Sequence, residues 1–358
     1  VRAALVVSAG FAEAGPEGAR LQQAMLETAQ RYGMRLVGPN CLGILRPRLG
    51  LNVTFCRGTA LPGDLALVSQ SGAICTAILD WAEPHQVGFS AVVSLGDAAD
   101  VDFGDILDYL ALDPQTHGIL LYVEGTQHTR GFISALRAAA RLKPVVVIKS
   151  GRHAEGSRAA ISHTAALIGA DDVFDAVLER AGAVRANTID DLFSAAQILS
   201  SGVRVEGNRL AIITNAGGPG VMATDRAVEL GLELPALSDS TLQALNKVLP
   251  PHWSHGNPVD ILGDATPDRY QEAVTACLKD DAVDGVMVIL TPQAMTHPTD
   301  AAKAVEKATR RSQKPVLACW MGERQVAEAW SLFSSKRLPR FRTPEATVEA
   351  FHYLAAYH

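Results

Sequence analysis

The stretch that decides the fold is Leu65-Ala66-Leu67-Val68-Ser69-Gln70-Ser71-Gly72, an apolar run that leads into a small polar turn. A helix-like segment, 73–82, follows directly. Short apolar runs alternate with amphipathic stretches along the whole chain, beginning at 4–7, 21–32 and 35–37. This alternation predicts α/β domains with parallel sheets.

The same pattern recurs later, at Leu210-Ala211-Ile212-Ile213-Thr214-Asn215-Ala216-Gly217. A second pair of landmarks keeps the same order, because Lys143-Pro144-Val145 returns as Lys314-Pro315-Val316. We therefore expect two α/β domains of one type to follow each other, the alternative being a chance similarity between α/β units.

The length of 358 residues predicts two or three domains. Polar stretches at 59–64 and 200–208 are the candidate boundaries. The expected domains are 1–62, 63–203 and 204–358.

The composition is that of a folded globular protein, with 48% hydrophobic and 20% charged residues. A net charge of −6 and the absence of a long basic run give no basis for binding nucleic acid or an anionic membrane. No long apolar run or signal-type start is present, so we expect a cytoplasmic protein. Widely spaced cysteines predict reduced thiols, and the pair His252 and His255 lacks further ligands, so no metal site is expected.

Each polar turn is a candidate anion site. A strand that enters a helix through small residues leaves the first N–H groups of the helix accessible, at its positive dipole end. The candidate phosphate-binding residues are Ser69, Gln70, Ser71 and Gly72 in the first turn and Thr214, Asn215, Gly217 and Gly218 in the second. The two helix ends could face one phosphate from both sides. The alternative is that the serines cap the helix and Gly72 eases a tight turn.

Two further residues are candidates for chemistry. His163 lies in a basic segment rich in small residues and has no counterpart in the second domain. Glu124 ends an apolar run, at the carboxyl end of an expected strand, where parallel sheets bind ligands. A carboxylate there could fix the tautomer of an imidazole. The alternatives are a solvent-facing loop histidine for His163 and a helix cap or surface ion pair for Glu124.

Additional motifs occur in a characteristic order. They are Gly38-Pro39-Asn40-Cys41, Ser94-Leu95-Gly96-Asp97, Asp100-Val101-Asp102, Asp113-Pro114, Glu124-Gly125, Lys149-Ser150-Gly151-Arg152, Ser162-His163-Thr164 and Asn257-Pro258-Val259-Asp260. With the two turns, they make the chain resemble the NDP-forming acyl-CoA synthetases, relatives of succinyl-CoA synthetase, and especially the bifunctional forms fused to a GNAT acetyltransferase. The likeness covers essentially the whole chain.

The resemblance implies a truncated Rossmann-like segment that binds coenzyme A through Asn40 and Cys41, followed by two flavodoxin-like ligase domains. It also implies a reaction path. The acyl group of acyl-CoA passes to phosphate, the acyl phosphate phosphorylates His163, which Glu124 orients, and the phosphohistidine then phosphorylates NDP. Ala165 departs from the family, which commonly has glycine after Ser-His-Thr.

The resemblance also implies partners. ATP or ADP with Mg²⁺ would bind an ATP-grasp domain outside this chain, in a parent that could also carry a GNAT domain. The chain starts without Met, so we expect the first half of the CoA domain upstream and no turnover by the chain alone. Folding should need no cofactor, and the protein could form a homodimer. The alternative function is a CoA-sensing regulatory region of a GNAT-type protein lysine acetyltransferase.

Overall fold

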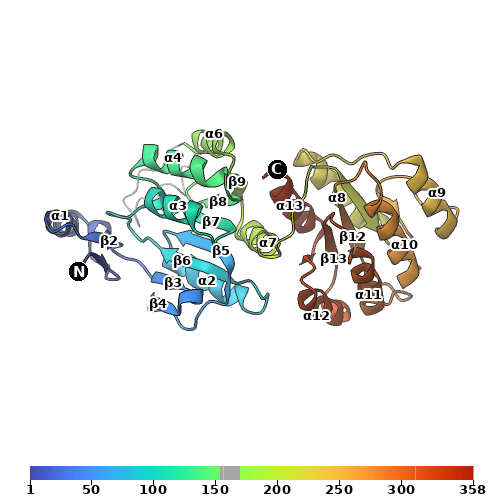
Figure 1. Cartoon of the computed structure of the whole chain (residues 1–358), viewed down its shortest axis with the longest axis horizontal. Coiled ribbons are helices and arrows are strands. Elements are labelled where there is room, and N and C mark those ends of the chain that lie inside the picture. The colour runs from blue at the N-terminus through green and yellow to red at the C-terminus, as the bar shows by residue number, and fades with distance from the viewer. Residues whose placement is uncertain (154–155, 157–169, 311, 358) are drawn as a thin grey trace. The chain divides into compact units, whose positions relative to one another are not determined.

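The computed structural model describes residues 1–153, 156, 170–310 and 312–357. The chain folds into two compact units, which are Val1–Ser200 and Ser201–Ala356 (Figure 1). Each unit is built around a sheet whose central strands are parallel and whose faces carry helices. The predicted α/β class with parallel sheets is therefore confirmed.

The sheet of the second unit has the strand order β11-β10-β12-β13-β14, with all neighbours parallel. Its strands are β10 (Leu210–Thr214), β11 (Val259–Asp260), β12 (Gly285–Leu290), β13 (Val316–Trp320) and β14 (Arg340–Phe341). In chain order this is 2-1-3-4-5, the arrangement of flavodoxin-like folds. The first strand after the boundary is therefore central, and its carboxyl end lies where the order reverses.

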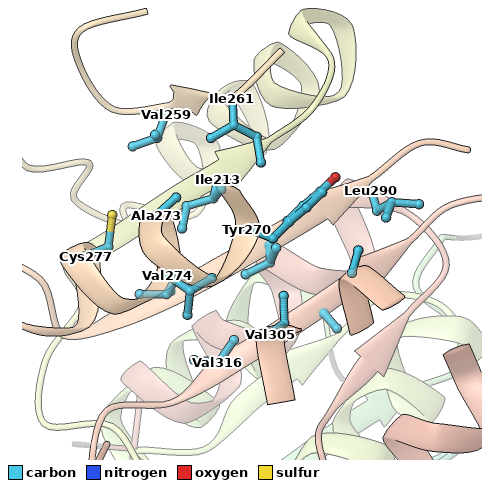
Figure 2. Packing of buried hydrophobic residues seen from close by; sticks show 14 of the residues in the cluster. Ile213, Val259, Ile261, Tyr270, Ala273, Val274, Cys277, Leu290, Val305 and Val316 are labelled. Carbon is cyan, nitrogen blue, oxygen red and sulfur yellow. The ribbon is translucent and has the colours of Figure 1, made fainter. Parts of the chain in front are cut away.

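Helices cover both faces of this sheet. They are α8 (Gly217–Glu229), α9 (Asp239–Val248), α10 (Pro267–Leu278), α11 (Pro298–Thr309), α12 (Ala327–Ser335) and α13 (Pro344–Ala355), with a short 3₁₀ turn η3 (Arg324–Val326). Helices α9 to α12 pack in sequence, and α8 packs against α13. Figure 2 shows Tyr270 and Val274 of α10 near Ile213 of β10 and Val305 of α11, all fully buried.

The first unit repeats this order in five of the seven strands of its larger sheet, β6-β5-β7-β8-β9. The strands are β5 (Pro62–Ser69), β6 (Phe89–Ser94), β7 (Gly118–Val123), β8 (Val145–Lys149) and β9 (Val184–Ala186), and the helices are α2 (Gly72–Ala82), α3 (Phe103–Leu112), α4 (Thr129–Ala140), α6 (Asp171–Ala181) and α7 (Ile189–Ser200). The shared 2-1-3-4-5 order supports the expected duplication.

A hairpin makes the first sheet wider than the second. Strands β3 (Gly43–Arg46) and β4 (Leu51–Thr54), joined by η2 (Pro47–Leu49), are antiparallel, and β3 also pairs antiparallel with β6. The sequence analysis placed these residues in the segment 1–62 and predicted no antiparallel strands. They extend the sheet of the first unit through the pairing of β3 with β6, and Leu45 and Arg46 are buried there. The strand β5 also begins at Pro62, inside the polar stretch expected to be a boundary.

The residues before the hairpin form one βαβ element, which consists of β1 (Ala3–Leu5), η1 (Ala12–Ala14), α1 (Pro16–Arg31) and β2 (Arg35–Val37). Its two strands are parallel, as expected for a piece of a Rossmann-like domain. The N–H of Leu36 donates to the carboxylate of Asp100 at 2.6 Å, and the Arg35 side chain contacts Asp100 and Asp105. These contacts hold the element against the loop that follows β6.

The repeated Lys-Pro-Val motif has the same structural task in both units. The Nζ of Lys143 donates to the backbone carbonyl of Asp113 at 2.6 Å, and the Nζ of Lys314 donates to that of Asp280 at 2.6 Å. Both carbonyls lie just beyond the end of a helix, where backbone acceptors lack partners within the helix. The motif therefore ties the end of a helix to the start of β8 in the first unit and of β13 in the second.

We predict that Arg46→Met lowers the free energy of unfolding of the first unit by about 3 to 5 kcal/mol. The Arg46 Nη2 lies 3.0 Å from the Asp113 Oδ2, and both residues are nine-tenths buried, so removing the cation leaves a buried carboxylate without its counter-charge. Urea unfolding measures the change. The control is Arg35→Met, whose side chain is 52% exposed and should cost at most about 1 kcal/mol. Equal effects of the two substitutions would contradict the assignment.

Candidate functional site

The turn after β5 is built by two serine side chains. The Ser69 hydroxyl donates to the carbonyl of Ser71 at 2.8 Å and accepts the N–H of Ser71 at 3.0 Å. The Ser71 hydroxyl accepts the N–H of Ile74 at 3.3 Å and so caps helix α2. Ser71 therefore caps the helix, as the alternative interpretation of the sequence expected. A phosphate at this turn would bind next to that cap.

The turn after β10 has the same backbone design. The Thr214 hydroxyl donates to the carbonyl of Ala216 at 2.7 Å and accepts its N–H at 3.0 Å. Helix α8 starts at Gly217 without a side-chain cap. The Asp260 Oδ2 lies 3.8 Å from the position that a Cβ on Gly217 would take. This carboxylate interacts favourably with the helix dipole, but it would oppose an anion at the same place.

The amide side chains of Gln70 and Asn215 hold neighbouring strand ends together. The Gln70 Oε1 accepts the N–H groups of Glu124 at 2.7 Å and Gly125 at 3.1 Å. The Asn215 Oδ1 accepts the N–H of Thr291 at 2.8 Å, and its Nδ2 donates to the carbonyl of Thr291 at 2.9 Å. We call these two sets of bonds the amide clamps. Sequence reasoning assigned both residues to phosphate binding, which stays a prediction, and it missed this positioning role.

Glu124 follows directly on β7, at the carboxyl end of the strand, where the sequence placed it. Its backbone N–H is fixed by the amide clamp of Gln70. Its expected partner, His163, lies outside the described residues, as does the neighbouring Ala165. The structure therefore positions the carboxylate at the expected sheet edge and leaves its pairing with the histidine as a prediction.

Asp97 adds a second carboxyl group to this edge of the sheet. It lies three residues after β6, is only 8% exposed, and its Oδ1 accepts the Nδ2 of Asn40 at 3.3 Å. Burial, together with the neighbouring carboxyl of Glu13, raises the pKa of Asp97 to about 7. Sequence reasoning noted Asp97 only within a motif, although the strand-end rule that selected Glu124 also applies to it.

Glu13 reaches this group from the amino-terminal βαβ element. Burial alone would raise the pKa of Glu13, but hydrogen bonds from the N–H groups of Gly10 and Phe11 and from Asp97 hold it below its ordinary value. The pair therefore divides its charge unequally: Glu13 keeps its negative charge more readily and Asp97 retains a proton more readily.

Two cavities adjoin this group. The smaller, about 20 Å³, is lined in part by Gln70, Asp97, Asp102 and Gly125. The larger, about 320 Å³, is lined by Val7, Asn40, Cys41, Leu42, Phe55, Gly72, Ala73 and Thr76. Asn40 connects the two, because it lines the larger cavity and donates to Asp97 in the smaller one. Both predicted CoA-binding residues, Asn40 and Cys41, thus face one cavity together with the start of helix α2.

The five cysteines are free thiols, and burial raises the pKa of Cys41 to about 11. The His255 Nε2 lies 2.8 Å from the carbonyl oxygen of Pro251. Across the described part of the chain there is no group of three or more side chains suited to a metal ion. The same residues include no helix long and apolar enough to cross a bilayer.

Comparison with known proteins places the chain in a family. Residues 62–199 match a family model described as the succinyl-CoA ligase like flavodoxin domain, and residues 210–355 match the ligase-CoA domain. The α subunit of acetate–CoA ligase [ADP-forming] I from Pyrococcus furiosus is 37% identical over 98% of this chain and 76% of its own length. The chain belongs to the NDP-forming acyl-CoA ligase family.

Two further relatives show how much of a full ligase this chain covers. Acetate–CoA ligase [ADP-forming] I from Archaeoglobus fulgidus is 42% identical over the whole chain, which spans 51% of that protein. A dinucleotide-forming acetyl-coenzyme A synthetase 1 from Ca. Korarchaeum cryptofilum, solved with phosphate and ADP, superimposes with a TM-score of 0.93 at 36% identity over 99% of this chain and 77% of its own. The chain therefore corresponds to the α-type region of these ligases and spans about half of the Archaeoglobus relative.

We predict that Gln70→Met speeds hydrogen exchange at the backbone amides of Glu124 and Gly125 by tenfold or more. The substitution leaves two part-buried N–H groups without their acceptor, at a cost of about 1 to 3 kcal/mol each. The matched variant Asn215→Leu should affect Thr291 in the second unit and leave Glu124 unchanged. Exchange rates of Glu124 that do not respond to Gln70→Met would refute the clamp.

We also predict that Asp97→Asn becomes more stable relative to the native protein as the pH rises from 5 to 8. A raised pKa means that the folded protein holds a proton between about pH 4 and pH 7 that the unfolded chain has released, so native stability falls across this window. Asparagine carries no such proton. The difference in unfolding free energy between Asp97→Asn and the native protein should grow by about 1 to 2 kcal/mol from pH 5 to pH 8. This figure is reduced for solvent screening, because the small cavity can admit a water molecule. Urea titrations at both pH values test this, and a constant difference would disprove it.

Proposed function

We propose that this chain is the acyl- and phosphoryl-transfer region of an NDP-forming acyl-CoA ligase, which interconverts acyl-CoA, phosphate and NDP with a carboxylic acid, CoA and NTP. The observation that carries the proposal is the match of nearly the whole chain to the α subunit of an ADP-forming acetate–CoA ligase. The relatives named for acetate support a small acid as the acyl group.

The proposed chemistry has three steps. A phosphate oxygen attacks the carbonyl carbon of acyl-CoA, the C–S bond breaks, and CoA leaves as its thiol after gaining a proton. A ring nitrogen of His163 then attacks the phosphorus of the acyl phosphate, and the carboxylate leaves. The phosphohistidine finally transfers its phosphoryl group to NDP. This is covalent catalysis, in which one difficult transfer is divided into easier ones.

The residues of the first unit suit the first two steps. Gly72 and Ala73, at the start of α2, line the same cavity as Asn40 and Cys41, so a phosphate bound there would lie near both the helix start and the end of CoA. Glu124 would hold the imidazole of His163 by accepting a hydrogen bond from the N–H of its other ring nitrogen. The Thr214–Gly218 turn is proposed as the second phosphate wall, with Asp260 restricting how an anion can approach it.

In the proposal, the nucleotide-binding part of the enzyme lies outside this chain. An ATP-grasp domain, on another part of the parent or on a partner subunit, would bind the nucleotide with Mg²⁺. The Pyrococcus relative is named as an α subunit, which supports a division of the enzyme into parts. The relatives are named as ligases, which favours an enzyme over a CoA-sensing region of an acetyltransferase.

We predict that the parent protein, incubated with ATP labelled at the γ-phosphate, acquires an acid-labile, base-stable label on His163. The label should disappear in His163→Ala and fall at least tenfold in Glu124→Gln, because the neutral amide no longer stabilises the imidazolium that forms during transfer. The control is His153→Ala, a histidine of the same segment, which should label normally. A native protein that takes up no label, or a label that survives His163→Ala, would favour ligand sensing over catalysis.

A further inference from the structure

We propose that Asp97 accepts the proton of the CoA thiol when the thiol attacks the acyl phosphate, and returns it in the reverse reaction. This inference rests on the proposed function and assigns one residue to a step that function leaves without a proton acceptor. It rests on the burial of Asp97, on the lack of a protein donor to its Oδ2 and on its place between two cavities.

The buried carboxyl group of Asp97 receives few hydrogen bonds from protein donors. Its Oδ1 accepts one long bond, from the Asn40 Nδ2 at 3.3 Å. No N–H or O–H donor reaches its Oδ2 within the described part of the chain, and its remaining side-chain partner is another acid, Glu13. Buried carboxyl oxygens are normally satisfied by donors, so a carboxyl that lines a cavity beside a second acid indicates a group that a proton or a ligand completes.

Asp97 lies between the places proposed for the two reactants. On one side it shares the small cavity with Gln70, beside the phosphate turn. On the other side it contacts Asn40, which lines the 320 Å³ cavity together with Cys41 and Gly72. A thiol that reaches past Asn40 toward a phosphate at the start of α2 therefore passes next to the Asp97 carboxyl.

The other titratable groups around Asp97 are less suited to the role. Asp102 uses its Oδ1 to cap α3, accepting the N–H groups of Gly104 and Asp105. Glu13 is held as a carboxylate by backbone N–H groups, which makes it a weak base. Cys41 keeps its proton, since burial raises its pKa to about 11. Glu124 is assigned to His163. The pKa of Asp97, raised to about 7, lies nearest to that of a thiol.

The step balances as written. The S–H bond breaks and its proton moves to Asp97, while the sulfur forms a bond to the carbonyl carbon of the acyl phosphate. The C–O bond to phosphate then breaks, and phosphate leaves with the electron pair. In reverse, phosphate attacks acyl-CoA and protonated Asp97 gives its proton to the departing sulfur.

The test measures acyl-CoA formation from acetyl phosphate and CoA by the parent enzyme, a half-reaction that needs neither nucleotide nor His163. For Asp97→Asn we expect kcat to fall by about 10²-fold or more, the usual contribution of a positioned base. CoA affinity should stay within threefold, and labelling of His163 by ATP should be unchanged. The control is Asp300→Asn, an exposed carboxylate of the second unit that lines neither cavity, which should stay within threefold of the native rate.

The native enzyme supplies a measurement that does not depend on how the variant folds. Its kcat/KM for CoA should increase about tenfold per pH unit below pH 7 and then level off, as Asp97 loses its proton. A profile without an inflection between pH 6 and 8 overturns the proposal, and so does an Asp97→Asn rate within threefold of native. Parallel loss of CoA affinity and of His163 labelling in the variant would make Asp97 structural. A native enzyme that neither converts acetyl phosphate nor labels His163 refutes the ligase function itself.

Discussion

The amide clamps are the interactions on which both candidate phosphate turns depend. At the carboxyl edge of a parallel sheet, each strand is followed by a separate loop. The loop after the first strand must lead into a helix and leave the first N–H groups of that helix accessible. In each unit one side-chain amide, Gln70 or Asn215, ties this turn to the end of the neighbouring strand. The hydroxyl of Ser69 or Thr214 closes the turn from the other side. These hydrogen bonds therefore fix the turns after β5 and β10, although the turns consist of small residues.

The two units use this common frame differently. In the first, acidic side chains gather near the turn, and burial leaves Asp97 with a proton near neutral pH. In the second, Asp260 lies against the bare helix start itself. The same frame thus places a buried carboxyl group with a raised pKa beside the turn of the first unit, and the Asp260 side chain beside the helix start of the second.

Much of the fold could be predicted from local patterns. The apolar run before Ser69 and its repeat before Thr214 determine central strands, because only strands buried on both faces read as continuous apolar runs. The hairpin around Arg46 was not predicted, since β3 pairs with the distant β6 and Arg46 with the distant Asp113, and local patterns reveal neither contact. The candidate site, too, could be predicted only where local patterns suffice. Strand-end position identifies Glu124, but only tertiary packing reveals that Gln70 holds its backbone and that Asn40 meets Asp97.

The hairpin also changes how the first sheet ends. The second sheet finishes in a strand of two residues, Val259–Asp260, directly after Pro258, and such an edge offers little for another chain to pair with. The first sheet finishes in the longer β4, where Leu51 is 42% and Val53 is 48% exposed. Compared with β11, β4 therefore offers a longer and more apolar edge, of the kind to which a strand of another chain can add.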